Sequence, residues 1–261
     1  MQLSDQRWAE IESKLPKVVD IQTRLLLPIE FISLKSGWES RLDEAAVCLR
    51  DASEVACDAV YALRQAHANL IWFREDAPDA PQEINACNFC KFYIDDVALR
   101  LYASAEHVRN FIIGFLDIQK SSLKPFRKRG FSKLDIVRGY LHKEMPSHAI
   151  SIAIEGLLFD ENWKKIIEYR NTWVHKQPPL IKGLGIVYER KGRWTKSDNS
   201  YKLGFGGGDK PKFTVDELLE NVSFATHALI NLLTDLTNLL YVRLSELGIN
   251  MDENGQTKVG I

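Results

Sequence analysis

The chain has 261 residues, of which 45% are hydrophobic, enough to build one large core or two smaller ones. Its formal net charge is −1, so the overall charge does not indicate a polyanionic partner. Four cysteines are too few for a secreted disulfide scaffold, the polar N-terminus does not resemble a signal peptide, and the apolar runs are too short for a membrane span. We therefore expect a cytoplasmic protein that does not enter a membrane.

The first half of the chain is dominated by a regular apolar pattern. Residues 1–35 are expected to form one or two short helices, interrupted by Pro16 and Pro28, before Gly37. Apolar residues in 38–73 then alternate in spacings of four and three. They are Trp38, Leu42, Ala45, Leu49, Ala52, Ala56, Ala59, Leu63, Ala66, Leu70 and Phe73. This heptad pattern predicts a long helix, and its many alanines allow a partner helix to approach closely.

Residues 88–119 carry a second heptad stripe and are the natural partner. The stripe consists of Ile94, Ala98, Leu101, Ala105, Val108, Ile112 and Phe115. We predict that the two segments form an antiparallel hairpin within one chain; an intermolecular coiled coil is the alternative. Glu106 and Asn110 share another face of the second helix, which either contacts solvent or supports a site on a neighbouring helix.

The segment that follows is basic and leads into shorter helices. Residues 120–133 contain six lysines or arginines and no acid. Ser132, with Asp135 three residues later, predicts a helix N-terminus. Another helix is expected over about 148–158, and Asp160 is placed to cap the helix after it.

That next helix is expected to end before Pro178 and Pro179, which cannot continue it. Arg170, Asn171 and His175 therefore fall in its last turns. Asn171 and His175 are four residues apart and share a face, whereas Arg170 and His175 diverge by about 140° on an ideal helix. Cations also interact favourably with the C-terminus of any helix, so an ordinary helix end is the alternative explanation.

The arrangement Arg170-Asn171-x3-His175 resembles the R-x(4–6)-H signature of the HEPN superfamily, the helical-bundle ribonucleases of toxins and defence systems. This resemblance implies a metal-independent endoribonuclease that cleaves RNA by attack of its 2′-hydroxyl. It implies that Arg170, Asn171 and His175 are catalytic at the composite site of a homodimer. It also implies that Glu106 or Asn110 supports the motif.

Two other functions fit the same sequence. Many HEPN domains are not catalytic, so a helical dimerisation or partner-binding module is one alternative. A single-stranded nucleic-acid-binding protein is the other. The resemblance to toxins also implies a protein partner that neutralises the activity. In toxins that a nucleotidyltransferase partner silences, a tyrosine stands two residues after the histidine, whereas this chain has Gln177 there.

Residues 180–212 differ from the rest because seven glycines interrupt any helical pattern. Runs at 186–188 and 201–203 predict a small β-hairpin. Residues 176–212 carry nine Lys or Arg and three Asp or Glu, with four aromatic residues among them. Basic and aromatic side chains together can hold phosphates and stack on bases, whereas the alternative is a solvated, charged hairpin. The predicted RNA contacts are Lys176, Arg190, Arg193 and Trp194.

The final helix is marked by a capping box of Thr214 with Glu217 and is expected to end at Gly248. The polar tail from Asn250 is expected to fray. Cys87 and Cys90 form a CxxC without a second pair at ligand spacing, so we expect no metal and no cofactor.

The predicted fold class is all-α: a bundle of long antiparallel helices with a small β-hairpin insertion before the last helix. We expect residues 1–87 to form an N-terminal helical extension packed on the core. Residues 88–261 would then form the HEPN-like helical core, with the hairpin insertion at about 180–212.

Overall fold

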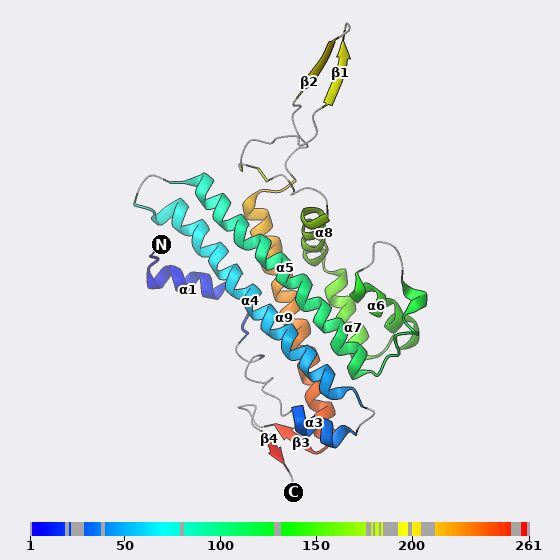
Figure 1. Cartoon of the computed structure of the whole chain (residues 1–261). Coiled ribbons are helices and arrows are strands. Elements are labelled where there is room, and N and C mark those ends of the chain that lie inside the picture. Colours follow the sequence, from blue (N-terminus) through cyan, green and yellow to red (C-terminus); the bar gives the residue numbers. More distant parts are fainter. Residues whose placement is uncertain are drawn as a thin grey trace.

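A computed structural model describes residues 2–18, 21, 29–37, 40–78, 81–127, 132–175, 179, 181–182, 184, 193–197, 200–204, 212–251 and 257–259. The fold is an all-α bundle, as predicted, with the long helices α4, α5 and α9 side by side (Figure 1). The α-helices of the described residues are α1 (Asp5–Ser13), α3 (Ile29–Ser36), α4 (Leu42–Ile71), α5 (Glu83–Phe115), α6 (Lys133–Glu144), α7 (Ala149–Phe159), α8 (Glu161–His175) and α9 (Val215–Glu246). A π-helical turn (Trp72–Asp76) follows α4, and a 3₁₀ turn (Lys124–Phe126) precedes α6.

The helices α4 and α5 form the antiparallel hairpin that the two heptad stripes predict. Small residues let their backbones approach closely. The Ser104 hydroxyl of α5 donates a hydrogen bond to the Ala52 carbonyl of α4 at 2.7 Å. A Cβ on Gly114 would lie 3.1 Å from the Cβ of Ala45, which is tighter than most such contacts. The alanines of the α4 stripe are therefore needed for the spacing between the two helices.

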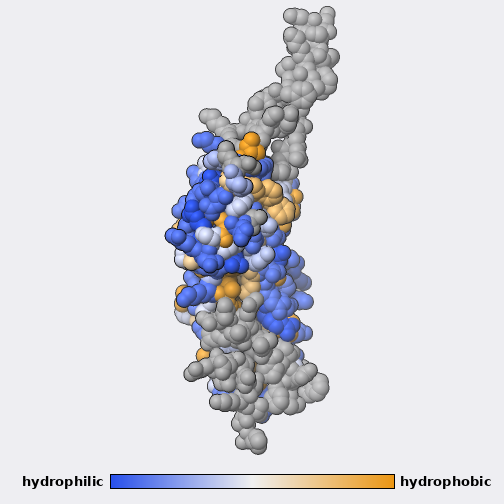
Figure 2. Space-filling model, turned by 90° about the vertical axis from the view of Figure 1, so that its left-hand side faces the viewer, coloured by the Kyte–Doolittle hydropathy of each residue, from blue (hydrophilic) through white to orange (hydrophobic). Residues whose placement is uncertain are grey.

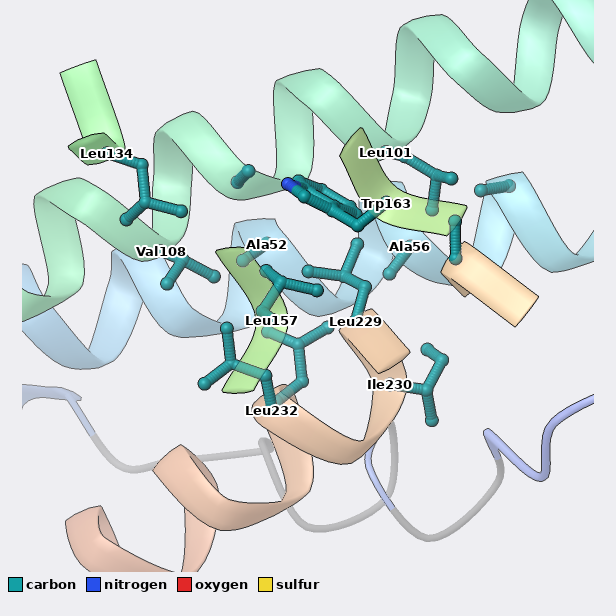
Figure 3. Packing of buried hydrophobic residues seen from close by; sticks show 14 of the residues in the cluster. Ala52, Ala56, Leu101, Val108, Leu134, Leu157, Trp163, Leu229, Ile230 and Leu232 are labelled. Atoms are coloured by element: carbon teal, nitrogen blue, oxygen red, sulfur yellow. The ribbon is translucent and has the colours of Figure 1, made fainter. Parts of the chain in front are cut away.

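One hydrophobic core joins the long helices to the shorter ones. The buried faces of α4, α5 and α9 share this core with residues of α6, α7 and α8. Figure 3 shows Trp163 of α8 directed among residues that include Ala56, Leu101 and Leu229. The expected boundary between residues 87 and 88 falls inside α5, so α4 and α5 pack as one unit across it.

The predicted helix ends are confirmed by their hydrogen bonds. Ser132 and Thr214 each form a complete capping box, at the starts of α6 and α9. Asp160 caps α8, because its Oδ1 accepts a hydrogen bond from the Trp163 amide at 2.7 Å. Gly248 adopts a φ of 74° just after α9, a conformation that favours glycine.

The hairpin insertion is present, with strands β1 (Arg193–Ser197) and β2 (Ser200–Gly204) paired antiparallel. The expected second strand at 201–203 is confirmed, but its partner is 194–196 and not the expected 186–188. The expected strand at 186–188 lies outside the described residues. Ile181 and Phe213 form a parallel bridge at the base of the insertion, beside the end of α8. The two ends of the insertion are therefore held together next to the Arg/His motif.

The described residues of the C-terminal tail form two paired strands, although its polar composition from Asn250 predicts fraying. Strand β3 (Ile249–Met251) pairs antiparallel with β4 (Thr257–Val259). Ile249 is 2% exposed and belongs to the main core, so hydrophobic burial holds the first strand in place. The Asn254-Gly255 pair between the two strands is the sequence signal that favours such a hairpin.

The coloured residues on the face in Figure 2 are mainly hydrophilic, with a few hydrophobic residues among them. Amphipathic helices that bury one stripe leave such a surface. Among the described residues, no helix has both the length and the hydropathy needed to cross a membrane.

Replacing Ala56 by leucine tests the close packing of α4. Ala56 is fully buried, so the added atoms of Ala56→Leu have no space, and we expect a loss of about 1–3 kcal/mol in the free energy of unfolding. Chemical denaturation measures this loss. Ala9→Leu, on an exposed position of α1, is the matched control and is expected to change stability by less than about 0.5 kcal/mol. Equal stability of the two variants would contradict close packing at Ala56.

Candidate functional site

The motif helix α8 has a buried face and a face that lines a pocket. Trp163, Ile166 and Tyr169 recur every three residues and are buried. The pocket-lining residues of α8 recur along the neighbouring face and include Asn171 and His175. Asn171 and His175 therefore share a face, as their spacing of four residues predicts.

Tyr169 fixes α8 to α5. Its hydroxyl donates a hydrogen bond to Asp95 Oδ1 at 2.5 Å, and Asp95 also forms an ion pair with Lys91. Burial and the adjacent Asp95 carboxylate raise the pKa of Tyr169, so its hydroxyl keeps the proton that it donates. The Tyr169 ring also meets Phe213 edge to face, which joins the base of the insertion to α8.

Arg170 is held beside the pocket by an aromatic ring and an amide. Its guanidinium lies 3.9 Å from the centre of the Tyr102 ring on α5, and Nη1 donates to Asn171 Oδ1 at 2.9 Å. Its buried Nε has no hydrogen-bond partner among the described residues, and no carboxylate there pairs with the side chain. Arg100 of α5, by contrast, is bonded to both Asp96 and Asp58. Arg170 is thus a half-buried cation with its charge still available to an anion.

A pocket of about 600 Å³ lies between α8 and the helices packed against it. Its lining combines aromatic and aliphatic side chains with several polar groups. The lining residues are Tyr102, Ala105, Glu106, Ser132, Leu134, Asp135, Leu158, Trp163, Lys164, Ile167, Glu168, Asn171, Thr172 and His175. They come from α5, α6 and its cap, α7 and α8, so the pocket exists only when these four helices pack together.

His175 is the last residue of α8; it is exposed and lines the pocket. Within the described residues, no hydrogen bond joins His175 to Arg170 or to Glu106. Glu106 also lines the pocket, but its carboxylate pairs with Lys133 Nζ at 2.7 Å. Asn110 is exposed, does not line this pocket and accepts a hydrogen bond from Arg109.

The structure therefore gathers only part of the predicted site in one place. Asn171, His175 and Glu106 line one pocket, and Arg170 adjoins it through Asn171. An exposed imidazole that lines a pocket can transfer protons, and a guanidinium without a carboxylate partner among the described residues can bind an anionic group.

Two of the four predicted RNA contacts belong to the described part of the insertion. Arg193 and Trp194 are in β1, where they pair in register with Gly204 and Leu203. Lys176 and Arg190 lie outside the described residues.

Tyr102 and Tyr169 are site residues that sequence reasoning missed. Tyr102 is seven residues after Asp95 and four before Glu106, so the three share one face of α5. This polar and aromatic stripe was the available signal, but nothing in the sequence shows that it faces α8.

Comparisons of the chain with protein-family models, with curated proteins and with solved structures found no match. The resemblance to the HEPN superfamily therefore rests on the Arg170-Asn171-x3-His175 motif.

Replacing Tyr169 by phenylalanine tests how α8 is anchored. Tyr169→Phe leaves Asp95 without one of its two partners in a half-buried place, so we expect a loss of about 1–3 kcal/mol in the free energy of unfolding. Tyr61→Phe is the matched control, because Tyr61 is 61% exposed, and it is expected to change stability little. Thermal or chemical denaturation that gives the same stability for both variants would contradict an anchoring hydrogen bond.

Proposed function

We propose that this protein is a HEPN-like endoribonuclease that cleaves RNA by attack of the 2′-hydroxyl on the adjacent phosphate. His175 transfers protons, Arg170 binds the phosphate, and Asn171 positions these groups. The observation that carries the proposal is Arg170, which is half-buried, stacked on Tyr102 and without a carboxylate partner among the described residues. A cation held in this way, on the same helix as an exposed histidine, suits a phosphodiester.

The chemistry requires what these side chains offer. The 2′-hydroxyl must lose a proton, the leaving 5′-oxygen must gain one, and negative charge develops on the phosphorane oxygens. Histidine titrates in the range suited to both proton transfers. Arginine presents several N–H donors in a plane that matches phosphate oxygens. Neither role calls for a metal ion in this mechanism.

The proposal includes a homodimer with the ends of α8 at the interface. Within one protomer, Arg170 contacts Tyr102 and Asn171, whereas His175 lies a turn further along the helix. A two-fold axis near the end of α8 would bring a second copy of each residue close. Val174, next to His175, is 44% exposed and offers apolar surface for such a contact.

The basic insertion would extend the RNA contact beyond the cleavage site. Its charges and aromatic residues, Arg193 and Trp194 among them, follow the motif in sequence, and its base lies beside Tyr169. We place this activity in the cytoplasm, under the control of a neutralising protein partner. The second candidate is a non-catalytic dimerisation module, which the exposed Val174 at the end of the motif helix also fits.

The chemistry predicts specific products from an RNA incubated with the purified protein. Fragments should carry a 2′,3′-cyclic phosphate and a 5′-hydroxyl, DNA of the same sequence should remain intact, and a chelator should not inhibit. His175→Ala and Arg170→Ala should each lose about 10²–10⁴-fold in cleavage rate, and Asn171→Ala should lose less. Gel analysis with end-group-specific enzymes identifies the products.

The matched control is His142→Ala, because His142 is exposed and its ring bonds Glu155, and neither residue lines the pocket. This variant should keep full activity. Cleavage that persists in His175→Ala, or that stops when metal ions are chelated, would contradict the mechanism. A folded protein that cleaves none of a broad RNA set would favour the dimerisation module.

Mixing two inactive variants tests the composite site. If one protomer supplies Arg170 and its partner supplies His175, a heterodimer of Arg170→Ala with His175→Ala retains one intact site. After subunit exchange, the mixture should recover about a quarter of the wild-type activity, because half of the dimers are heterodimers and each has one of two sites. Light scattering should give the mass of a dimer. A monomer at micromolar concentration, or no recovery after exchange, would contradict the composite site.

A further inference from the structure

The charged side chains that line the pocket are mainly acidic. Glu106, Asp135 and Glu168 contribute carboxylates, while Lys164 contributes an ammonium that is paired with Glu161 at 2.7 Å. Like charges repel, so a phosphate group is disfavoured inside such a lining. The scissile phosphate therefore fits outside this lining, toward the motif residues at the end of α8, and the pocket is left for an uncharged part of the RNA.

The walls of the pocket suit a flat, partly apolar group. Tyr102 and Trp163 contribute aromatic rings, and Leu158 and Ile167 contribute aliphatic surface. A volume of about 600 Å³ lies in the usual range for small-molecule sites and exceeds the size of one nucleoside. Nucleobases unstacked from a single strand are commonly bound between such side chains.

The carboxylates determine which base fits. Glu168 is exposed, whereas Glu106 is half-buried. Asp135 already accepts hydrogen bonds at Oδ2 from the amide and the hydroxyl of Ser132. Glu106 uses Oε2 for Lys133 and has no partner for Oε1 among the described residues. A carboxylate only accepts hydrogen bonds, so the bound base must present N–H donors.

Guanine presents two such donors side by side, N1–H and the N2 amino group, which match the two oxygens of one carboxylate. Adenine and cytosine offer only an exocyclic amino group on this edge, beside a ring nitrogen that accepts. Uracil offers one N–H between two carbonyl oxygens, which a carboxylate repels. Among the four bases, guanine is therefore the best match for Glu106.

We propose that this pocket binds a guanine base of the RNA, with Glu106 as the residue that determines specificity; as a subsite of the cleavage centre, it rests on the proposed function. A cation is the other ligand that acidic side chains attract. The acidic residues of the described chain do not form a group that could hold a metal ion.

Binding of free nucleosides tests the proposal without any RNA cleavage. Guanosine and uridine are titrated separately into the intact protein and followed by ¹⁵N NMR, which also reports the Trp163 indole. Guanosine should shift signals around the pocket and bind about tenfold or more tightly than uridine. Inosine lacks the N2 amino group and should fall between the two.

Two variants separate base recognition from structure. Glu106→Gln keeps the shape of the side chain but loses its charge and one acceptor, so guanosine affinity should fall by about tenfold. Lys133→Met breaks the same ion pair while leaving the carboxylate in place, so it should keep or improve guanosine affinity. Glu155→Gln, outside the pocket lining, should have no effect. The NMR spectra of the variants show whether each is folded.

Guanosine that binds no better than uridine would overturn the proposal. An equal loss in Glu106→Gln and Lys133→Met would do the same, because it would show that the ion pair matters only for structure. Tighter binding of N-acetyl-arginine amide than of guanosine would instead identify a site for a cationic protein side chain. Guanosine-specific binding by a protein that cleaves no RNA would contradict the nuclease activity while leaving the base site established.

Discussion

The close approach of α4 and α5 is the constraint on which the rest of the structure depends. Alanine, serine and glycine along the contact allow the Ser104 hydroxyl to reach the Ala52 carbonyl of the facing helix. Two helices this close form a tightly packed pair, and the faces that they leave uncovered can pack against other helices. The helix α9 packs against both members of the pair, and α5 in addition provides a surface for α6 and α8.

The polar and aromatic stripe of α5 determines where the motif helix lies. Asp95 receives the Tyr169 hydroxyl, and the Tyr102 ring lies under the Arg170 guanidinium. These contacts involve adjacent residues of α8, so they fix both its position and its rotation. As a consequence, Asn171 and His175 line the pocket instead of facing the core. A change in this docking would move the whole candidate site, because its residues share one rigid helix.

The charges around the motif are separated in a way that suits an RNA substrate. Arg170, which has no carboxylate partner among the described residues, and the exposed His175 lie toward the end of α8, three carboxylates line the pocket, and the basic insertion follows α8 in the sequence. A phosphodiester is attracted to the first and third of these regions, and a base with N–H donors suits the second. In this proposal the phosphate of the RNA binds where positive charge lies, and the guanine base binds where the carboxylates lie.

Local patterns in the sequence determined the helical class, the antiparallel pairing of α4 with α5, the caps at Ser132, Asp160 and Thr214, and the shared face of Asn171 and His175. These features depend on residues a few positions apart or on a repeated apolar spacing, so they can be read along the chain. The same reasoning did not predict the pairing of β3 with β4, which begins at Ile249, a residue buried in the core.

Only the tertiary structure decided how the site is assembled. Tyr102 meets Arg170 across 68 positions of sequence, and the pocket needs side chains from four helices. Glu106 and Asn110 belong to one polar face of α5, but the tertiary structure treats them differently. Glu106 forms an ion pair with Lys133, whereas Asn110 is exposed. Such contacts depend on the angles and rotations at which helices pack. Those are set by the whole core, whereas helix periodicity specifies only which residues share a face.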